Sequence, residues 1–277
     1  MLFKSFCNYA LIGMLLLSAG CGKPEQAAVQ PLPQEELIPF PEEKVLALHP
    51  LKLREKGTPR ITAVCYHEIL EDAKDIYAVS PQSFRRHLRE FKLSGYSFIG
   101  LKDLKEYRDT GRPLPPKPLF ISFDDGYLNN YTQAYPILRE EAAKATFFVV
   151  SGNMEHKNRM TFAQMREMAA HGMEFGSHTL QHEKLTGMSD KELEQEIVTS
   201  KELLEAKLRL PVYGIAYPCG YASPAAMRLV QQHYRLGFYA NVDDKRSESY
   251  YTFNRYGVFR WNEHIRSIFQ QPQPKLE

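Results

Sequence analysis

At residues 119–126 the sequence reads LFISFDDG, a short apolar run that ends in two adjacent aspartates and a glycine. A proline-rich segment, PLPPKP at residues 113–118, leads into it. An apolar run of this length bounded by turn-forming residues is typical of a buried strand. Asp124 and Asp125 would then lie at its carboxyl end, where α/β folds gather their functional groups. Because successive side chains of an extended segment point in different directions, one carboxylate can bind a metal while the other stays free.

A pair of histidines forms the second motif, SHTLQH at residues 177–182, which follows the apolar run MEFGS at residues 173–177. On its own an Asp-Asp-Gly segment is most often a turn. A His-x-x-x-His pair on its own is most often solvated or satisfied by neighbours. Their positions at strand ends change this interpretation, because two imidazoles and one carboxylate can hold a divalent metal with positions left open for water and substrate. The two motifs therefore favour a hydrolytic metal site over a structural one.

Strands and helices alternate through most of the chain. We expect apolar strands at residues 61–66, 119–123, 146–150, 173–177, 212–216, 236–240 and 256–260, about seven in all. Helix starts are indicated by Ser80-Pro81, by Ser223-Pro224 and by capping boxes that begin at Thr161 and Ser189. This repetition is compatible with a barrel or with a doubly wound sheet. No Gly-x-Gly-x-x-Gly follows a strand, so a nucleotide-binding sheet lacks its expected fingerprint.

With SFDDG at residues 122–126 and SHTxxH at residues 177–182, the chain resembles the polysaccharide deacetylase family, carbohydrate esterase family 4. The resemblance extends over roughly residues 61–265 and implies an irregular (β/α)7 barrel, which we adopt as the expected fold. It also implies that Asp124 is the catalytic base. Asp125, His178 and His182 would hold one divalent metal, zinc in the first place, with nickel, cobalt or iron as alternatives.

Two departures from the family pattern concern the groups around the base. The third motif is usually Arg-x-Pro-aromatic-Gly, whereas residues 216–220 read AYPCG, so Ala216 stands where the arginine is expected. The late segment that carries the general acid is also missing. However, the early strand ITAVCYHE at residues 61–68 ends in His67, which we take as the acid. An early histidine strand resembles the branch of the family that deacetylates poly-β-1,6-N-acetylglucosamine, the exopolysaccharide of biofilms.

The remaining site residues are interpreted within this resemblance. Arg255, at the start of the last expected strand, is our substitute for the missing arginine, with a surface salt bridge as the alternative. A backbone amide near Tyr217 and Pro218 would help to hold the oxyanion. His264, Asp243 and Asp244 are weaker alternatives as acid or positioning groups. His87 and His171 are interpreted as structural.

The amino-terminal segment is typical of a targeting signal. Lys4 precedes an apolar stretch at residues 9–17, and Ser18-Ala19-Gly20-Cys21 resembles the cleavage site of a bacterial lipoprotein. We expect residues 1–20 to be a signal peptide and Cys21 the lipidated first residue of the mature protein; a plain secretory signal is the alternative. Gly22 favours the outer membrane, if the cell has one. Residues 21–58 are rich in proline and form a tether, and residues 59–270 form the deacetylase domain.

Composition and charge restrict the possible partners. The formal net charge is +2, which is too small to indicate nucleic-acid binding, and we expect a monomer. In an exported protein Cys65 and Cys219 could pair, although two small buried residues are the favoured interpretation.

These observations lead to one functional hypothesis with named alternatives. We expect a metal-dependent hydrolase that removes N-acetyl groups from an extracellular polysaccharide, with poly-β-1,6-N-acetylglucosamine as the preferred substrate. The alternatives are a peptidoglycan or chitin-oligomer deacetylase, an O-acetyl esterase, and an inactive glycan-binding lipoprotein on the same scaffold. The expected location is the periplasm or cell surface, anchored to the membrane through Cys21, with exopolysaccharide export or synthesis machinery as an additional partner.

Overall fold

The computed structural model describes residues 54–71, 75–240 and 247–270. Its main sheet has eight strands, all paired in parallel, in the order β10-β1-β5-β6-β7-β8-β9, with β4 pairing β5 off this path. The strands are β1 (Thr62–Tyr66), β4 (Ser97–Ile99), β5 (Pro118–Phe123), β6 (Thr146–Val149), β7 (Glu174–Ser177), β8 (Gly214–Ala216), β9 (Leu236–Phe238) and β10 (Tyr256–Gly257). A separate two-stranded sheet joins β2 (Glu68–Ile69) to β3 (Ala78–Val79).

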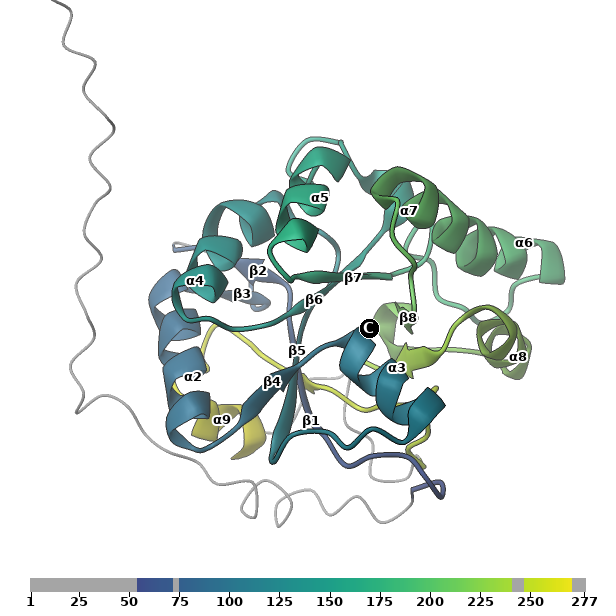
Figure 1. Cartoon of the computed structure of the whole chain (residues 1–277). Helices are drawn as coiled ribbons and strands as arrows, with labels where there is room; N and C mark the ends of the chain where they lie inside the picture. The colour runs from purple at the N-terminus through teal and green to yellow at the C-terminus, as the bar shows by residue number, and fades with distance from the viewer. Residues whose placement is uncertain (1–53, 72–74, 241–246, 271–277) are drawn as a thin grey trace, which may run out of the picture. The chain divides into compact units, whose positions relative to one another are not determined.

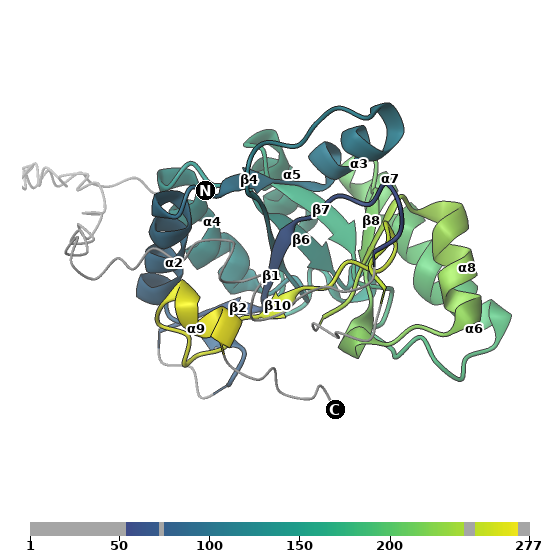
Figure 2. The same ribbon diagram turned by 90° about the horizontal axis from the view of Figure 1, so that it is seen from below.

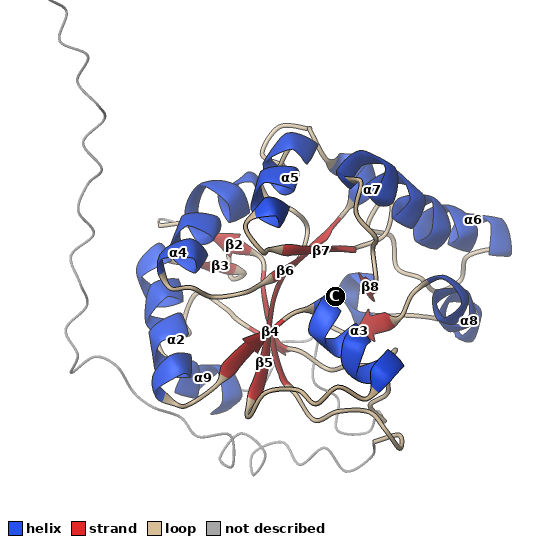
Figure 3. Ribbon diagram, viewed as in Figure 1, coloured by secondary structure: helices blue, strands red, loops and turns tan. Residues whose placement is uncertain are grey.

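Helices surround this sheet on its outer side (Figures 1 and 3). They are α2 (Pro81–Leu93), α3 (Leu101–Thr110), α4 (Tyr135–Glu140), α5 (Phe162–Ala170), α6 (Asp190–Glu194), α7 (Ser200–Leu208), α8 (Pro224–His233) and α9 (Ile265–Gln270). Figure 2, seen from below, shows α9 beside α2, where the buried Glu90 accepts a hydrogen bond from the backbone N–H of Ile265 at 2.9 Å. Among the described residues no helix is long and apolar enough to cross a membrane.

The segment between β9 and β10 curls the sheet toward closure. Phe238 of β9 forms a parallel bridge with Phe253, and the backbone N–H of Tyr239 donates to the Phe253 carbonyl at 2.8 Å. Four residues later, at Gly257, the same segment pairs with β1 through β10. Residues 253–257 therefore connect the two edges of the sheet, and they carry Arg255 into the interior.

The expected helix starts are confirmed. The side chains of Ser80, Thr161, Ser189 and Ser223 each accept a hydrogen bond from the backbone N–H three residues on, as N-caps do. The helix that begins after Ser189 reaches Leu208 through a five-residue π-helical segment, Gln195–Thr199.

The expected strands differ from the structure in several places. The short strands β2 and β3 were not predicted, and the strands predicted over residues 212–216 and 236–240 are shorter, Gly214–Ala216 and Leu236–Phe238. Strand β4 was not predicted, because three residues between Gly95 and Gly100 are too few to show a pattern. The last strand was predicted over residues 256–260 but ends at Gly257. Beyond it the chain turns, since the backbone N–H of Phe259 donates to Asn262 at 2.8 Å and that of Arg260 donates to the Ile76 carbonyl at 2.9 Å.

Aromatic side chains fill the interior of the curled sheet. Phe120 and Phe238 stack with ring centroids 4.7 Å apart, and Phe148 and Phe253 lie against Phe238. Gly176 allows this packing, because a Cβ atom there would lie 2.5 Å from the Phe148 ring. The packed interior forms a rigid floor beneath the carboxyl ends of the strands.

His87 and His171 are structural, as expected. The fully buried His87 ring lies 3.0 Å from the Tyr66 hydroxyl. His171 is the C-cap of α5 and lies 2.7 Å from the Tyr135 hydroxyl.

Candidate active site

The carboxyl end of the parallel sheet carries a pocket of about 290 Å³. His67 follows β1, Asp124 and Asp125 follow β5, and His178 follows β7, so three strands bring their carboxyl ends to one place. The pocket is lined by His67, Glu68, Asp75, Tyr77, Asp124, Asp125, Tyr127, His178, His182, Cys219 and Ala240.

Asp125, His178 and His182 form a compact set of metal-binding groups. One donor atom from each lies within 4.8 Å of the others, and Asp125 Oδ1 is 3.6 Å from His178 Nε2 and 3.3 Å from His182 Nε2. Asp125 Oδ1 is buried and has no hydrogen-bond partner among the described residues. An unpartnered buried carboxylate oxygen facing two imidazoles is what a bound cation would satisfy. The residues therefore fit a divalent metal.

The protein fixes the orientation of the two histidines. His178 Nδ1 lies 2.9 Å from the Ala216 carbonyl, which leaves Nε2 free to face the metal position. Burial lowers the pKa of His178, so its imidazole is held in the neutral, ligating form. The loop to His182 is held by the buried Glu196, whose Oε2 accepts from the backbone N–H groups of Leu180 and Gln181 at 3.1 and 2.9 Å.

Asp124 lies beside this set and is paired with Arg255. The guanidinium donates from Nη1 to Oδ1 at 2.7 Å and from Nη2 to Oδ2 at 2.8 Å, a bidentate arrangement. Arg255 also donates to Ser122 Oγ and to the Tyr239 carbonyl, both at 2.9 Å. Burial alone would raise the pKa of Asp124, but Arg255 and then His178 outweigh it and hold that pKa well below its usual range. Asp124 is therefore a buried carboxylate that stays ionised.

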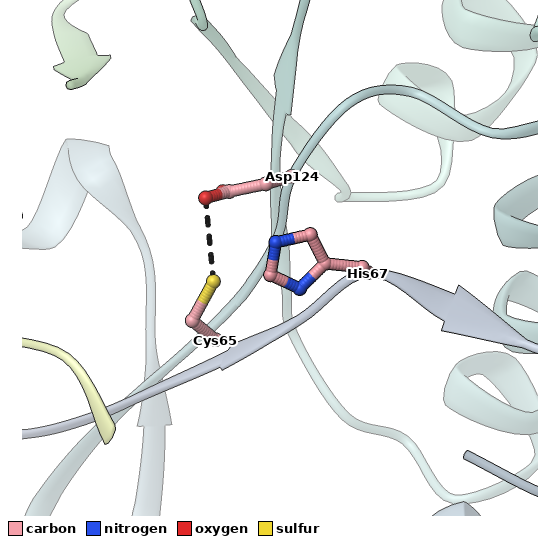
Figure 4. A group of neighbouring side chains, drawn as sticks. All are labelled: Cys65, His67 and Asp124. Atoms are coloured by element: carbon pink, nitrogen blue, oxygen red, sulfur yellow. Dashed lines mark hydrogen bonds between the residues drawn. The ribbon is translucent and has the colours of Figure 1, made fainter. Parts of the chain in front are cut away.

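Cys65 and His67 approach Asp124 from β1 (Figure 4). The Cys65 thiol donates to Asp124 Oδ2 at 3.3 Å, and burial raises the pKa of this thiol, so it remains a neutral donor. The His67 ring lies against Tyr77, with centroids 4.8 Å apart, and its Nδ1 is buried without a hydrogen-bond partner among the described residues. Donor atoms of Cys65, His67 and Asp124 also lie within 4.8 Å of one another. Because Arg255 already neutralises Asp124, the set with Asp125 is the better metal site.

Several expected site residues do not reach the pocket. The backbone N–H of Tyr217 donates to the Phe238 carbonyl at 2.9 Å within the sheet, and Pro218 has no N–H, so neither can hold an oxyanion as predicted. Cys219 is the residue of this segment that lines the pocket. His264 is also wrong as an alternative acid, because its ring contacts Glu90 at 2.5 Å next to α9. Asp243 and Asp244, like Cys21, lie outside the described residues.

Cys65 and Cys219, the two cysteines among the described residues, are unpaired in the structure, which agrees with the interpretation of two separate residues. Cys65 is fully buried and Cys219 is partly exposed. Sequence reasoning missed other pocket residues. Tyr127 could have been found, since it directly follows the Asp-Asp-Gly motif, and Arg159 lies 4.1 Å from its ring centroid. Tyr77 and Asp75 sit in a loop whose sequence carries no comparable signal.

Comparison with known proteins places these motifs in a family. Residues 111–237 match the family model described as polysaccharide deacetylase. Residues 111–237 therefore resemble a polysaccharide deacetylase domain. The Bacillus subtilis protein YxkH, which carries the name polysaccharide deacetylase, is 28% identical over 241 residues, covering 84% of this chain and 85% of that protein. The poly-β-1,6-N-acetyl-D-glucosamine N-deacetylase of Staphylococcus aureus is 26% identical over 172 residues, or 56% of this chain and 58% of that enzyme.

Solved structures support the expected barrel. The Streptococcus pyogenes deacetylase PplD, solved in complex with acetate, is similar with a TM-score of 0.70 and 26% identity over 79% of this chain and 99% of PplD. IcaB from Ammonifex degensii has a TM-score of 0.67 at 23% identity, over 79% of this chain and 99% of IcaB. The (β/α)7-type deacetylase barrel predicted from the sequence is thereby confirmed, and the deacetylase domain supports hydrolase activity on a polysaccharide.

Proposed function

We propose that this protein is a metal-dependent hydrolase that removes N-acetyl groups from an extracellular polysaccharide, with poly-β-1,6-N-acetylglucosamine as its preferred substrate. The observation that carries the proposal is the pairing of two functions in one pocket. Asp125, His178 and His182 offer a metal-binding set, and Asp124 is kept ionised next to them by Arg255. A scaffold that had lost its activity would have no need to maintain a buried charged pair beside a metal-binding set.

The three donors fit a first-row divalent ion, zinc in the first place, with nickel, cobalt or iron as alternatives. When bound, such an ion would supply Lewis-acid chemistry, making water acidic and polarising the acetyl carbonyl. His178 and His182 face this position through Nε2. Asp125 completes the set with Oδ1, which has no hydrogen-bond partner in the part of the chain that the structure describes.

Asp124 serves as the base in this proposal. Its Oδ2 lies 3.8 Å from His178 Nε2, so the carboxylate borders the position at which a water would be activated. Arg255 orients both carboxylate oxygens and keeps them unprotonated, which leaves Asp124 ready to accept the proton of the water. The Cys65 thiol contributes a further hydrogen bond to the same carboxylate.

His67 serves as the acid that protonates the leaving amine. It reaches the pocket from β1, adjacent to β5, which carries Asp124. The Tyr77 ring supports its imidazole from one side, and Asn130 Nδ2 donates to the His67 carbonyl at 2.7 Å, which fixes the end of the strand. Base and acid therefore approach the metal-binding set from neighbouring strands, so that one could activate water and the other release the amine.

The choice of polymer rests on the arrangement of these groups and on similarity. The early strand that ends in His67 and the third motif that lacks its arginine at Ala216 are the features by which the sequence resembles the poly-β-1,6-N-acetylglucosamine branch. The similarity to the Staphylococcus aureus deacetylase of that polymer supports the same choice. In our proposal a protein tethered through Cys21 would meet the polymer outside the cytoplasmic membrane, and newly exposed amines would become cations that bind anionic cell surfaces.

Acetate release from defined glycans tests this proposal. The purified protein, supplied with zinc, is assayed on β-1,6-linked and β-1,4-linked N-acetylglucosamine pentamers and on an O-acetylated glycan. We expect the fastest release from the β-1,6 pentamer. Equal or reversed rates on the two pentamers would overturn the linkage, and release from the O-acetylated glycan alone would overturn the reaction.

A further inference from the structure

A second pocket, of about 310 Å³, lies beside the proposed catalytic pocket. It is lined by Leu70, Glu71, Ala78, Ser80, Arg260 and Trp261. The segments that follow β1 line both pockets, because Glu68 and Tyr77 belong to the first and Leu70 and Ala78 to the second. The two pockets are thus neighbours across the small sheet formed by β2 and β3.

A row of aromatic rings connects the two pockets. Tyr77, which supports His67, lies 5.7 Å from Phe259 between ring centroids. Phe259 is buried and stacks on Trp261, with centroids 5.1 Å apart and ring planes 18° from parallel. Tyr77 lines the catalytic pocket and Trp261 lines the second pocket. The Phe259 ring lies between these two side chains.

Trp261 is held in place by its neighbours in the chain. Asn262 is fully buried, and its Oδ1 accepts from the Phe259 backbone N–H at 2.8 Å. The backbone N–H of Arg260 donates to the Ile76 carbonyl at 2.9 Å, which ties this turn to the segment that carries Tyr77. The indole is nevertheless 40% exposed, and Leu70 across the pocket is 43% exposed. The large apolar side chains of Trp261 and Leu70 are therefore exposed to solvent, and hydrogen bonds fix the turn that carries Trp261.

The chemistry of this second pocket suits a sugar ring. An indole with one face packed on Phe259 can offer the other to the C–H face of a pyranose, and aromatic side chains gain from such flat contact. Glu71, Ser80 and Arg260 place polar groups around it that sugar hydroxyls could meet. Exposed apolar surface with a polar rim is typical of a ligand-binding groove.

We propose that Trp261 and Leu70 form a subsite for sugar residues that flank the one whose acetyl group is removed. This inference rests on the proposed function, since the occupant is the same polysaccharide. Binding energy gained at a distance from the reacting bond raises turnover by holding the substrate in place. The protein should therefore act better on oligomers long enough to reach Trp261 than on shorter ones.

A direct test uses the fact that the sequence contains a single tryptophan, Trp261. Its intrinsic fluorescence in the full-length protein is recorded immediately after mixing with a β-1,6-linked N-acetylglucosamine pentamer or with the monosaccharide. We expect the pentamer to change the intensity or emission maximum in a saturable way and the monosaccharide to leave both unchanged. No change with the pentamer would overturn the subsite.

A second measurement compares kcat/KM across oligomer lengths for four proteins: the wild type and the Trp261→Ala, Trp261→Phe and Tyr221→Ala variants. Tyr221 is the matched control, an exposed aromatic residue outside both pockets. In Trp261→Ala, kcat/KM should fall about 3- to 10-fold on the pentamer and change little on the shortest active oligomer. Trp261→Phe should retain most of the rate, and Tyr221→Ala should match the wild type.

The outcomes separate this inference from the proposed function. An equal loss at every length for Trp261→Ala, or a length-dependent loss confined to Tyr221→Ala, would overturn the subsite while the deacetylase activity stands. A wild type that releases no acetate from any glycan would overturn the proposed function, and the fluorescence titration would still decide whether Trp261 binds the oligomer.

Discussion

Arg255 donates hydrogen bonds to both carboxylate oxygens of Asp124, at 2.7 and 2.8 Å, although the two residues are 131 positions apart in the sequence. The arginine comes from residues 253–257, which connect β9 to β1, and both partners are almost completely inaccessible to solvent. The family's usual arginine position is Ala216, whose carbonyl instead contacts His178. The Arg255–Asp124 ion pair therefore links the proposed base to residues 253–257, the segment that connects the two edges of the curled sheet.

Removing the arginine should harm both stability and turnover. Arg255→Ala leaves a buried carboxylate without its cation, which typically costs about 3–5 kcal/mol of unfolding free energy. Acetate release should fall as well, because Asp124 loses its orientation and its low pKa. Denaturant unfolding and steady-state kinetics measure the two effects. The control is Arg89→Ala, because Arg89 lies on α2 and forms a partly exposed salt bridge with Glu141. Near wild-type kinetics for Arg255→Ala would contradict the positioning role.

Replacing His67 should slow the reaction without unfolding the protein. Loss of a general acid typically lowers turnover about 10²–10⁴-fold. We expect the loss of turnover in His67→Ala to lie in this range. The variant should keep its metal, since His67 lies outside the set formed by Asp125, His178 and His182. His264→Ala serves as the comparison, because that side chain contacts Glu90 away from the pocket. An inactive His264→Ala beside an active His67→Ala would show that the acid is wrongly placed.

His87 should make the fold sensitive to acid. Burial lowers its pKa to about 3, from an ordinary value of 6.5. Below about pH 6.5 the unfolded chain binds a proton that the folded protein excludes, so the free energy of unfolding falls as the pH drops toward 3. One such group contributes at most about 1.4 kcal/mol per pH unit.

Chemical denaturation between pH 7 and pH 4 measures this slope. His87→Gln should show a shallower loss of stability than the wild type over that window. His156→Gln, which replaces an exposed histidine, should keep the wild-type slope. Parallel slopes for the wild type and His87→Gln would mean that His87 does not carry the effect.

Cys21 should determine membrane attachment. The sequence around it predicts that Cys21 becomes the lipidated first residue of the mature protein. We expect Cys21→Ser to move the protein from the membrane fraction to the soluble fraction in detergent partition, with Cys65→Ser as the matched control. Unchanged partition of Cys21→Ser would indicate an uncleaved anchor or another attachment.

Much of the site could be predicted from sequence because its signals are local. Asp124, Asp125, His178 and His182 lie in two short motifs, each directly after an apolar strand, and parallel strands bring such ends together. Helix starts were equally local, since a cap and its partner are three residues apart. His67, the histidine that ends the first strand, is predicted as the acid only through the family resemblance, because a lone histidine after a strand is more often structural or exposed.

The rest depends on contacts between distant segments. The Tyr217 amide could not be excluded as an oxyanion donor until β9 was seen to occupy it. The contact between Arg255 and Asp124 depends on the segment that connects β9 to β1. No short sequence pattern predicts that connection. The aromatic row from Tyr77 to Trp261 likewise joins segments that only the fold brings together.

The most direct test of the central claim measures metal content and acetate release on the same preparations of five proteins, the wild type and four variants. The wild type should carry about one divalent ion and release acetate from the β-1,6-linked pentamer. Asp124→Asn should keep the ion and lose about 10²–10⁴-fold in rate, because the proposed base is not a ligand. Asp125→Asn should lose both, and His178→Ala and His182→Ala should behave like it. Full metal occupancy in the Asp125→Asn protein, or wild-type acetate release by Asp124→Asn, would contradict the assignment of ligand and base.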